Sequence, residues 1–121
     1  MTDLSKITCI EDLRLLAKRR VPRMFYDYAD SGSWTEGTYR ANETDFQKIL
    51  LRQRVAINME GRSTATTMIG EPVKMPVAIA PTGLTGMQHA DGEIHAARAA
   101  EKFGIPFTLS TMSICCIEDM A

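Results

Sequence analysis

The sequence predicts an α/β fold in which a helical amino-terminal region precedes parallel strands, each followed by a helix. Two apolar runs carry this prediction, residues 77–80 (Val-Ala-Ile-Ala) and residues 107–109 (Phe-Thr-Leu). Continuous apolar runs are typical of strands that are covered on both faces, as in parallel sheets. A helical pattern lies between the two runs, and their separation of about 30 residues is the size of one βαβ unit.

The composition is that of an ordinary globular domain. The chain has 121 residues, a formal net charge of -1, 45% hydrophobic and 24% charged residues. This balance argues against a disordered chain and against a basic nucleic-acid-binding module. No apolar run approaches the roughly 20 residues that cross a bilayer, and the amino terminus lacks a secretory signal pattern. We therefore expect a cytoplasmic protein that binds no nucleic acid.

The three cysteines, Cys9, Cys115 and Cys116, form neither a CxxC pair nor a cluster with histidine. Their number is odd, and adjacent cysteines rarely bridge each other. We expect reduced thiols and no metal site.

Three helices are expected in the amino-terminal half. In the first, Thr8 and Glu11 match a capping box, and apolar residues recur behind it at three- and four-residue spacing. The second begins at Pro22 and ends at Gly32 in a left-handed conformation. The third covers residues about 36–50. The inward-facing side chains are expected to be Ile10, Leu13, Leu16 and Ala17, then Met24, Phe25 and Tyr28, then Tyr39, Phe46, Ile49 and Leu50.

Four basic residues lie at the carboxyl end of the first helix and at the start of the second. The basic residues suit a helix carboxyl end, where the dipole favours positive charge. A phosphate-binding patch is the other interpretation, but no aromatic residues interleave with the cations as a stacking platform requires. We favour a solvated helix end, formed by Lys18, Arg19, Arg20 and Arg23.

A small hairpin is expected next, from residues 64–69 and 73–75, with a turn that contains Gly70. Pro72 makes the second strand very short or confines it to an edge. After the first parallel strand, a helix is expected to begin with Asp91 as N-cap and to end at Gly104. Another helix is expected from about Ser113.

The crossover between the two apolar runs makes these strands parallel, so their carboxyl ends meet at one edge of the sheet. In barrels and doubly wound sheets, ligands bind at that edge. Small polar residues follow both strands there: Thr82, Gly83, Ser110 and Thr111. The residue types alone leave open whether they bind a ligand or only turn the chain.

Two doubly covered strands also need neighbours on both sides and helices on both faces. Unpaired buried backbone groups would each cost about 1–3 kcal/mol. A complete (β/α)8 barrel needs roughly 250 residues. We therefore expect an incomplete domain, divided into residues 1–74, with helices and hairpin, and residues 75–121, with two β/α units.

At these residues the sequence resembles the amino-terminal third of the FMN-dependent 2-hydroxy-acid dehydrogenase and oxidase family, which includes flavin-type L-lactate dehydrogenase and glycolate oxidase. The match extends from about Ile7 to Ala121 and rests on the order and spacing of short segments. These segments are residues 21–23 (VPR), 26–28 (YDY), 31–32 (SG), 40–42 (RAN), 75–76 (MP), 80–83 (APTG), 89 and 92–93 (H, GE), 97–100 (ARAA) and 109–111 (LST).

The resemblance implies a partial (β/α)8 TIM barrel, with amino-terminal helices, a hairpin at the barrel bottom and the first two barrel strands. It implies that Pro81, Thr82 and Gly83 lie against the flavin of FMN and that the hydroxyl of Ser110 binds the flavin. It also implies that Tyr28 donates a hydrogen bond to the substrate carboxylate.

The resemblance further implies an enzyme that oxidises an L-2-hydroxy acid to a 2-oxo acid. It implies a homo-oligomer for the full-length enzyme. It leaves open whether the full-length protein makes peripheral contact with the inner face of the membrane. Met112 stands where glycolate-oxidase-like members carry tryptophan, which favours L-lactate. Some members have alanine at the position of Gly83, a change that a backbone role tolerates. His89 and His95 do not match the family's catalytic histidine, which lies later in the family, so we expect the isolated chain to be inactive.

Two other interpretations remain. In the first, the chain is a non-catalytic fragment that acts by association or complementation, because open strand edges invite pairing. In the second, it belongs to another FMN barrel, such as a type 2 isopentenyl isomerase, but residues 26–28 and 31–33 argue against this.

Overall fold

The structure is a computed structural model that describes residues 4–120, and it forms two compact units. The first ends at Gly61 and the second begins at Arg62. The predicted hairpin therefore belongs to the second unit together with the two β/α segments. The functional division after residue 74 stays a prediction, because compactness alone does not decide it.

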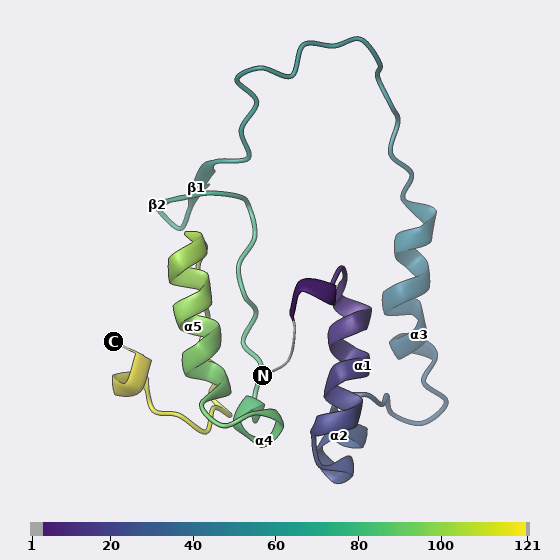
Figure 1. Cartoon of the computed structure of the whole chain (residues 1–121), viewed down its shortest axis with the longest axis vertical. Coiled ribbons are helices and arrows are strands. Elements are labelled where there is room, and N and C mark those ends of the chain that lie inside the picture. Colours follow the sequence, from purple (N-terminus) through teal and green to yellow (C-terminus); the bar gives the residue numbers. More distant parts are fainter. Residues whose placement is uncertain (1–3, 121) are drawn as a thin grey trace. The chain divides into compact units, whose positions relative to one another are not determined.

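The first unit is helical (Figure 1). Its elements are η1 (Leu4–Lys6), α1 (Ile10–Arg20), α2 (Arg23–Ala29), α3 (Gly37–Thr44) and η2 (Asp45–Lys48). The start of α1 departs from the predicted capping box. The carboxylate of Asp12, and not that of Glu11, accepts hydrogen bonds from the backbone N–H groups of Thr8 and Cys9, at 2.8 and 3.3 Å.

Further expectations for these helices were wrong, among them that Ile10 and Met24 face inward, because both are exposed. The helix α2 ends at Ala29, and Gly32 does not adopt a left-handed conformation. Instead Gly32 has no room for a side chain, because a Cβ there would lie 2.6 Å from Cβ of Tyr39. The buried aromatic of α2 is Tyr26, whereas Tyr28 is 72% exposed.

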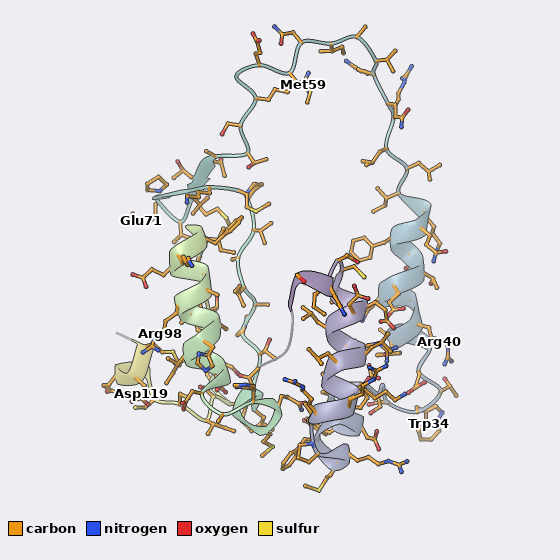
Figure 2. All side chains as sticks on the ribbon, in the orientation of Figure 1. Trp34, Arg40, Met59, Glu71, Arg98 and Asp119 are labelled. Carbon is orange, nitrogen blue, oxygen red and sulfur yellow. The ribbon has the colours of Figure 1, made fainter. Side chains whose placement is uncertain are left out.

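The third helix is shorter than expected and continues as the 3-10 helix η2. Three apolar side chains around its end were expected to face inward and are exposed in this unit: Phe46, Ile49 and Leu50. Leu51 and Val55, in the extended segment that follows, are also exposed. Figure 2 shows the side chains of this segment, including Met59. Apolar spacing places such residues on one face of a helix, but it does not supply the surface that buries them.

The second unit contains the hairpin of β1 (Thr66–Met68) and β2 (Glu71–Val73), then α4 (Thr85–Gln88), α5 (Gly92–Phe103) and η3 (Ile117–Met120). The strands β1 and β2 are antiparallel, with Met68 opposite Glu71. Ile69 and Gly70 form the two-residue turn, both with positive φ (53° and 83°), as a type I′ turn requires. The hairpin lies at the carboxyl end of α5 (Figure 1), where the backbone N–H of Lys74 donates to the carbonyl of Gly104 at 3.0 Å.

The two apolar runs pair in parallel, as predicted. Ile79 and Phe107 form a parallel bridge. The Ile79 N–H donates to the carbonyl of Pro106 at 2.9 Å, and the Ile79 carbonyl accepts from Thr108 N–H at 3.1 Å. The pairing is confined to this bridge, whereas the predicted strand covered residues 77–80. Parallel pairs gain slightly less stability per residue than antiparallel ones, and none of the described segments pairs on the other side.

The ends of the last two helices also differ from expectation. Gly104 ends α5 in the predicted left-handed conformation (φ 85°), but Asp91 precedes α5 at φ 55° without making a side-chain cap. No helix begins at Ser113. The chain makes a turn there, in which the Ser113 N–H donates to the Ser110 carbonyl at 3.1 Å, and the 3-10 helix η3 starts only at Ile117.

Candidate functional site

The parallel bridge brings the two strand-end loops of the second unit together. The backbone N–H of Leu84 donates to the carbonyl of Met112 at 3.0 Å, which joins the loop after residue 80 to the loop after residue 109. Gly83 and Ser110 are neighbours there, because a Cβ built on Gly83 would lie 3.4 Å from the Ser110 hydroxyl. The structure thus brings together two of the residues that the sequence placed at one edge.

The polar groups at this edge are neutral. The Ser110 hydroxyl accepts a hydrogen bond from the Met112 N–H at 3.1 Å and keeps its own proton free to donate. The Thr82 hydroxyl donates to the Ala80 carbonyl at 3.4 Å, and both Pro81 and Thr82 are exposed. Neutral hydroxyl and backbone groups of this kind suit the carbonyl oxygens and ring nitrogens of a neutral heterocycle.

Gly83 faces Met112 more closely than it faces any other residue. An added Cβ would lie 2.8 Å from Cβ of Met112 and 3.4 Å from its carbonyl oxygen. Since contacts below 3.0 Å essentially never occur between real Cβ atoms, alanine at this position would displace backbone. In this chain alanine at position 83 is therefore predicted to strain the packing of the two loops, even where a backbone role tolerates it.

Glu93 is the main residue of this region that the sequence analysis missed. It was assigned only to the first turn of a helix, yet its side chain is 1% exposed. Its carboxylate accepts hydrogen bonds from Gly86 N–H and Ile114 N–H, at 3.4 and 3.2 Å. A usable signal was its seven-residue spacing from the buried Ala100, which places both on the inner face of α5.

The pKa of Glu93 reflects these contacts. Burial acts to raise the pKa, but the Thr85 side chain and the N–H groups of Ile114 and Gly86 outweigh it and lower the pKa to about 2. The Thr85 hydroxyl is buried and makes no hydrogen bond of ordinary geometry, so we attribute the effect to its dipole beside the carboxylate. Glu93 is therefore ionised at neutral pH.

Tyr28, the predicted substrate-binding residue, lies on α2 in the first unit and is exposed. Its neighbour Tyr26 is instead part of a polar network. The Tyr26 hydroxyl donates to Asp30 at 2.6 Å, and Arg14 donates to the same carboxylate at 2.8 Å. The hydrogen bond from Tyr26, followed by that from Arg14, lowers the pKa of Asp30, and the bond to Asp30 raises the pKa of Tyr26.

Other chemical groups are sparse. No cluster of three or more His, Cys, Asp or Glu side chains that could hold a metal occurs within residues 4–120. Cys9, Cys115 and Cys116 are free thiols. The rings of His89 and His95 meet edge to face with centroids 5.5 Å apart. None of the described helices has the length and apolar character to cross a bilayer.

Residues 17–121 match the family model described as FMN-dependent dehydrogenase. The chain belongs to this family. FMN is the family's cofactor, and the neutral polar groups of Thr82, Gly83 and Ser110 fit a flavin ring. This confirms the resemblance that the short segments indicated.

Curated relatives in the family are L-lactate dehydrogenases. The chain is 50% identical over 115 residues to that of Stenotrophomonas maltophilia (strain R551-3) and 49% identical to that of Pseudomonas putida (strain GB-1). Each alignment covers 95% of this chain and 30% of the relative. The chain thus spans about a third of the length of the relatives it matches.

Solved structures agree. A soluble mutant of the membrane-associated (S)-mandelate dehydrogenase from Pseudomonas putida has a TM-score of 0.89 and 38% identity, over 95% of this chain and 33% of that one. A structure described as the monotopic membrane protein (S)-mandelate dehydrogenase gives 0.89 and 37%, over 95% and 31%. The described fold is therefore that of a segment of these enzymes.

Proposed function

We propose that this chain forms the amino-terminal part of an FMN-dependent oxidoreductase that oxidises an L-2-hydroxy acid, L-lactate, to the 2-oxo acid. One observation carries the proposal. The loops after the two parallel segments place Gly83 beside Ser110, with neutral donors only, in a chain of the FMN-dependent dehydrogenase family.

The architecture we propose is a partial (β/α)8 barrel. The Ile79–Phe107 bridge joins the first two barrel strands, α5 is the first crossover helix, and the hairpin of β1 and β2 closes the bottom. Likeness to the mandelate dehydrogenase structures supports this arrangement. The hairpin at the carboxyl end of α5 also supports it, because that helix end lies opposite the edge where parallel strands end.

Each predicted site residue has a role in this proposal. When bound, FMN supplies the acceptor for the two electrons that leave the substrate. Residues 81–83 present backbone to the ring, and Ser110 donates its hydroxyl proton, since its oxygen already accepts from Met112 N–H. Tyr28 donates its phenolic proton to the substrate carboxylate, for which its exposed position leaves the hydroxyl available.

L-lactate is the preferred substrate in the proposal for two reasons. The curated relatives at about 50% identity are L-lactate dehydrogenases, whereas the mandelate dehydrogenase structures are 37–39% identical. Met112, which stands beside Gly83, replaces the bulky tryptophan of glycolate-oxidase-like members.

The isolated 121-residue chain should be inactive, because neither His89 nor His95 matches the catalytic histidine of the family. The test joins this chain to the remaining 70% of the Stenotrophomonas maltophilia L-lactate dehydrogenase. The joined protein should bind FMN stoichiometrically and reduce a dye with L-lactate, and the isolated chain should do neither. Stoichiometric yellow flavin with turnover in the isolated chain, or a folded joined protein without flavin, would contradict the proposal.

A second candidate is a non-catalytic fragment that acts by association. Exposed large apolar side chains favour it, among them Trp34 (98% exposed, Figure 2) and Leu51 (92%). Size-exclusion chromatography of the isolated chain distinguishes the two. The fragment role would be supported if the isolated chain self-associates as its concentration rises and the joined protein self-associates to the same extent.

The remaining parts of the proposal concern the whole enzyme. We infer a homo-oligomer with a small 2-hydroxy acid as substrate, no nucleic acid and no metal. The location is cytoplasmic, with peripheral membrane contact, by analogy with the membrane-associated mandelate dehydrogenase. Sedimentation of the joined protein with and without vesicles of anionic phospholipid tests that contact.

A further inference from the structure

Glu93 has no part in the chemistry proposed above, yet its side chain is among the most buried of those described. It projects from the first turn of α5, the helix that connects the two parallel segments. A buried ionised carboxylate is costly unless it is compensated, so the contacts that compensate it indicate what it does.

These contacts reach both strand-end loops. One oxygen, Oε1, accepts from Gly86 N–H, in α4 within the first connection, and from Ile114 N–H in the second connection, at 3.4 and 3.2 Å. The other oxygen, Oε2, accepts from the thiol of Cys115 at 3.6 Å. A single side chain therefore links two segments that are far apart in the sequence.

The donors are neutral, which distinguishes this arrangement from a salt bridge. Two backbone N–H dipoles and a thiol stabilise the negative charge of the carboxylate. Two of these donors are backbone N–H groups, whose positions do not change when a side chain rotates. The linkage therefore fixes main-chain positions at Gly86 and Ile114 and not only side-chain conformations.

Both linked segments adjoin the candidate site. Gly86 is three residues after Gly83, and Ile114 is four residues after Ser110. The Leu84–Met112 backbone bond lies between these pairs. The groove lined by Ile94, Arg98 and Asp119, also in the second unit, carries no group that identifies an occupant.

We propose that Glu93 is a positioning residue that fixes the separation of the loop at residues 83–86 and the loop at residues 110–115, and thereby the spacing of Gly83 and Ser110. The importance of this spacing for flavin binding rests on the function proposed above. The linkage itself does not, because it is a property of the ligand-free chain.

The test uses the full 121-residue chain without ligand and three variants: Glu93→Ala, Glu93→Gln and the matched control Glu101→Gln, an exposed residue of the same helix. Amide hydrogen exchange is followed by NMR. In Glu93→Ala, exchange at Gly86 and Ile114 should accelerate together by about tenfold or more, while amides in the middle of α5 keep their rates. Glu93→Gln keeps one acceptor oxygen and should restore part of the protection.

Alkylation of the cysteines by iodoacetamide provides a second readout. Burial and the Glu93 carboxylate both raise the pKa of the Cys115 thiol, so loss of the charge should speed its alkylation several-fold. Cys9 and Cys116, which do not contact Glu93, should react at unchanged rates. Because Glu93→Gln is nearly isosteric, this readout remains if Glu93→Ala does not fold.

Two results would overturn the proposal. Faster exchange at only one of the two amides would show that Glu93 does not join the loops. A uniform acceleration at all amides and all three cysteines would show a general role in folding. Failure of the proposed function gives a different set of results. The joined enzyme would then lack flavin, while the expected changes in amide exchange and cysteine alkylation would still be observed in this chain.

Discussion

The contact between Gly83 and Met112 gives a sharp prediction. In Gly83→Ala, the new Cβ would lie 2.8 Å from Cβ of Met112, an atom attached directly to the backbone. Rotation of the Met112 side chain cannot relieve this contact, so the backbone must shift and strain the Leu84–Met112 hydrogen bond of 3.0 Å. Overpacking of this kind costs about 1–3 kcal/mol, and we expect a loss of that size.

The assay is urea unfolding of the isolated chain followed by circular dichroism. A matched pair of second-site variants separates the Cβ contact from other causes. Met112→Gly removes the clashing atom and should restore most of the stability that Gly83→Ala loses. Met112→Ala keeps the Cβ and should restore little. The reasoning would be refuted if Gly83→Ala were as stable as the parent chain, or if the two Met112 variants rescued it equally.

Four further predictions follow from other sites. Gly104→Ala should lower the free energy of unfolding by about 1 kcal/mol in the same urea assay, because φ is 85° there and L residues disfavour the left-handed region. Since the native pKa of Glu93 is about 2, below its ordinary 4.5, its charge stabilises the native state above pH 4.5, and this contribution is lost as the pH falls toward 2. It should amount to about 1–3 kcal/mol and be missing from the pH dependence of unfolding in Glu93→Gln. Tyr26→Phe should lower the urea midpoint because it removes the bond to Asp30, whereas Tyr28→Phe should leave the midpoint unchanged. In the joined enzyme, Tyr28→Phe should raise KM for L-lactate roughly tenfold, the effect of losing about 1.4 kcal/mol of binding.

The sequence predicted the elements whose formation depends on local chemistry. Gly104 ends α5 because glycine adopts positive φ without steric cost. Gly70 contributes to the hairpin turn for the same reason. The parallel pairing of Ile79 and Phe107 was also predictable, because a short helical crossover permits few other arrangements.

The amino-terminal helices show where local reasoning fails. Spacing identified an apolar face on α2 but chose Tyr28 over Tyr26 as the buried aromatic. The difference depends on Arg14 and Asp30, which surround the Tyr26 hydroxyl with partners from another helix and from the end of α2. Burial of a tyrosine depends on whether its hydroxyl finds a partner, and periodicity does not contain that information.

The sequence by itself determined the family, the hairpin, the parallel pairing of the two apolar runs, and the presence of small polar residues where both parallel segments end. Only the tertiary structure decided that Gly83 contacts Met112 and that Glu93 is buried between two loops. The physical reason is that turns, caps and crossovers depend on neighbours along the chain. Close packing and the compensation of a buried charge depend on atoms that only the folded chain brings within a few ångströms.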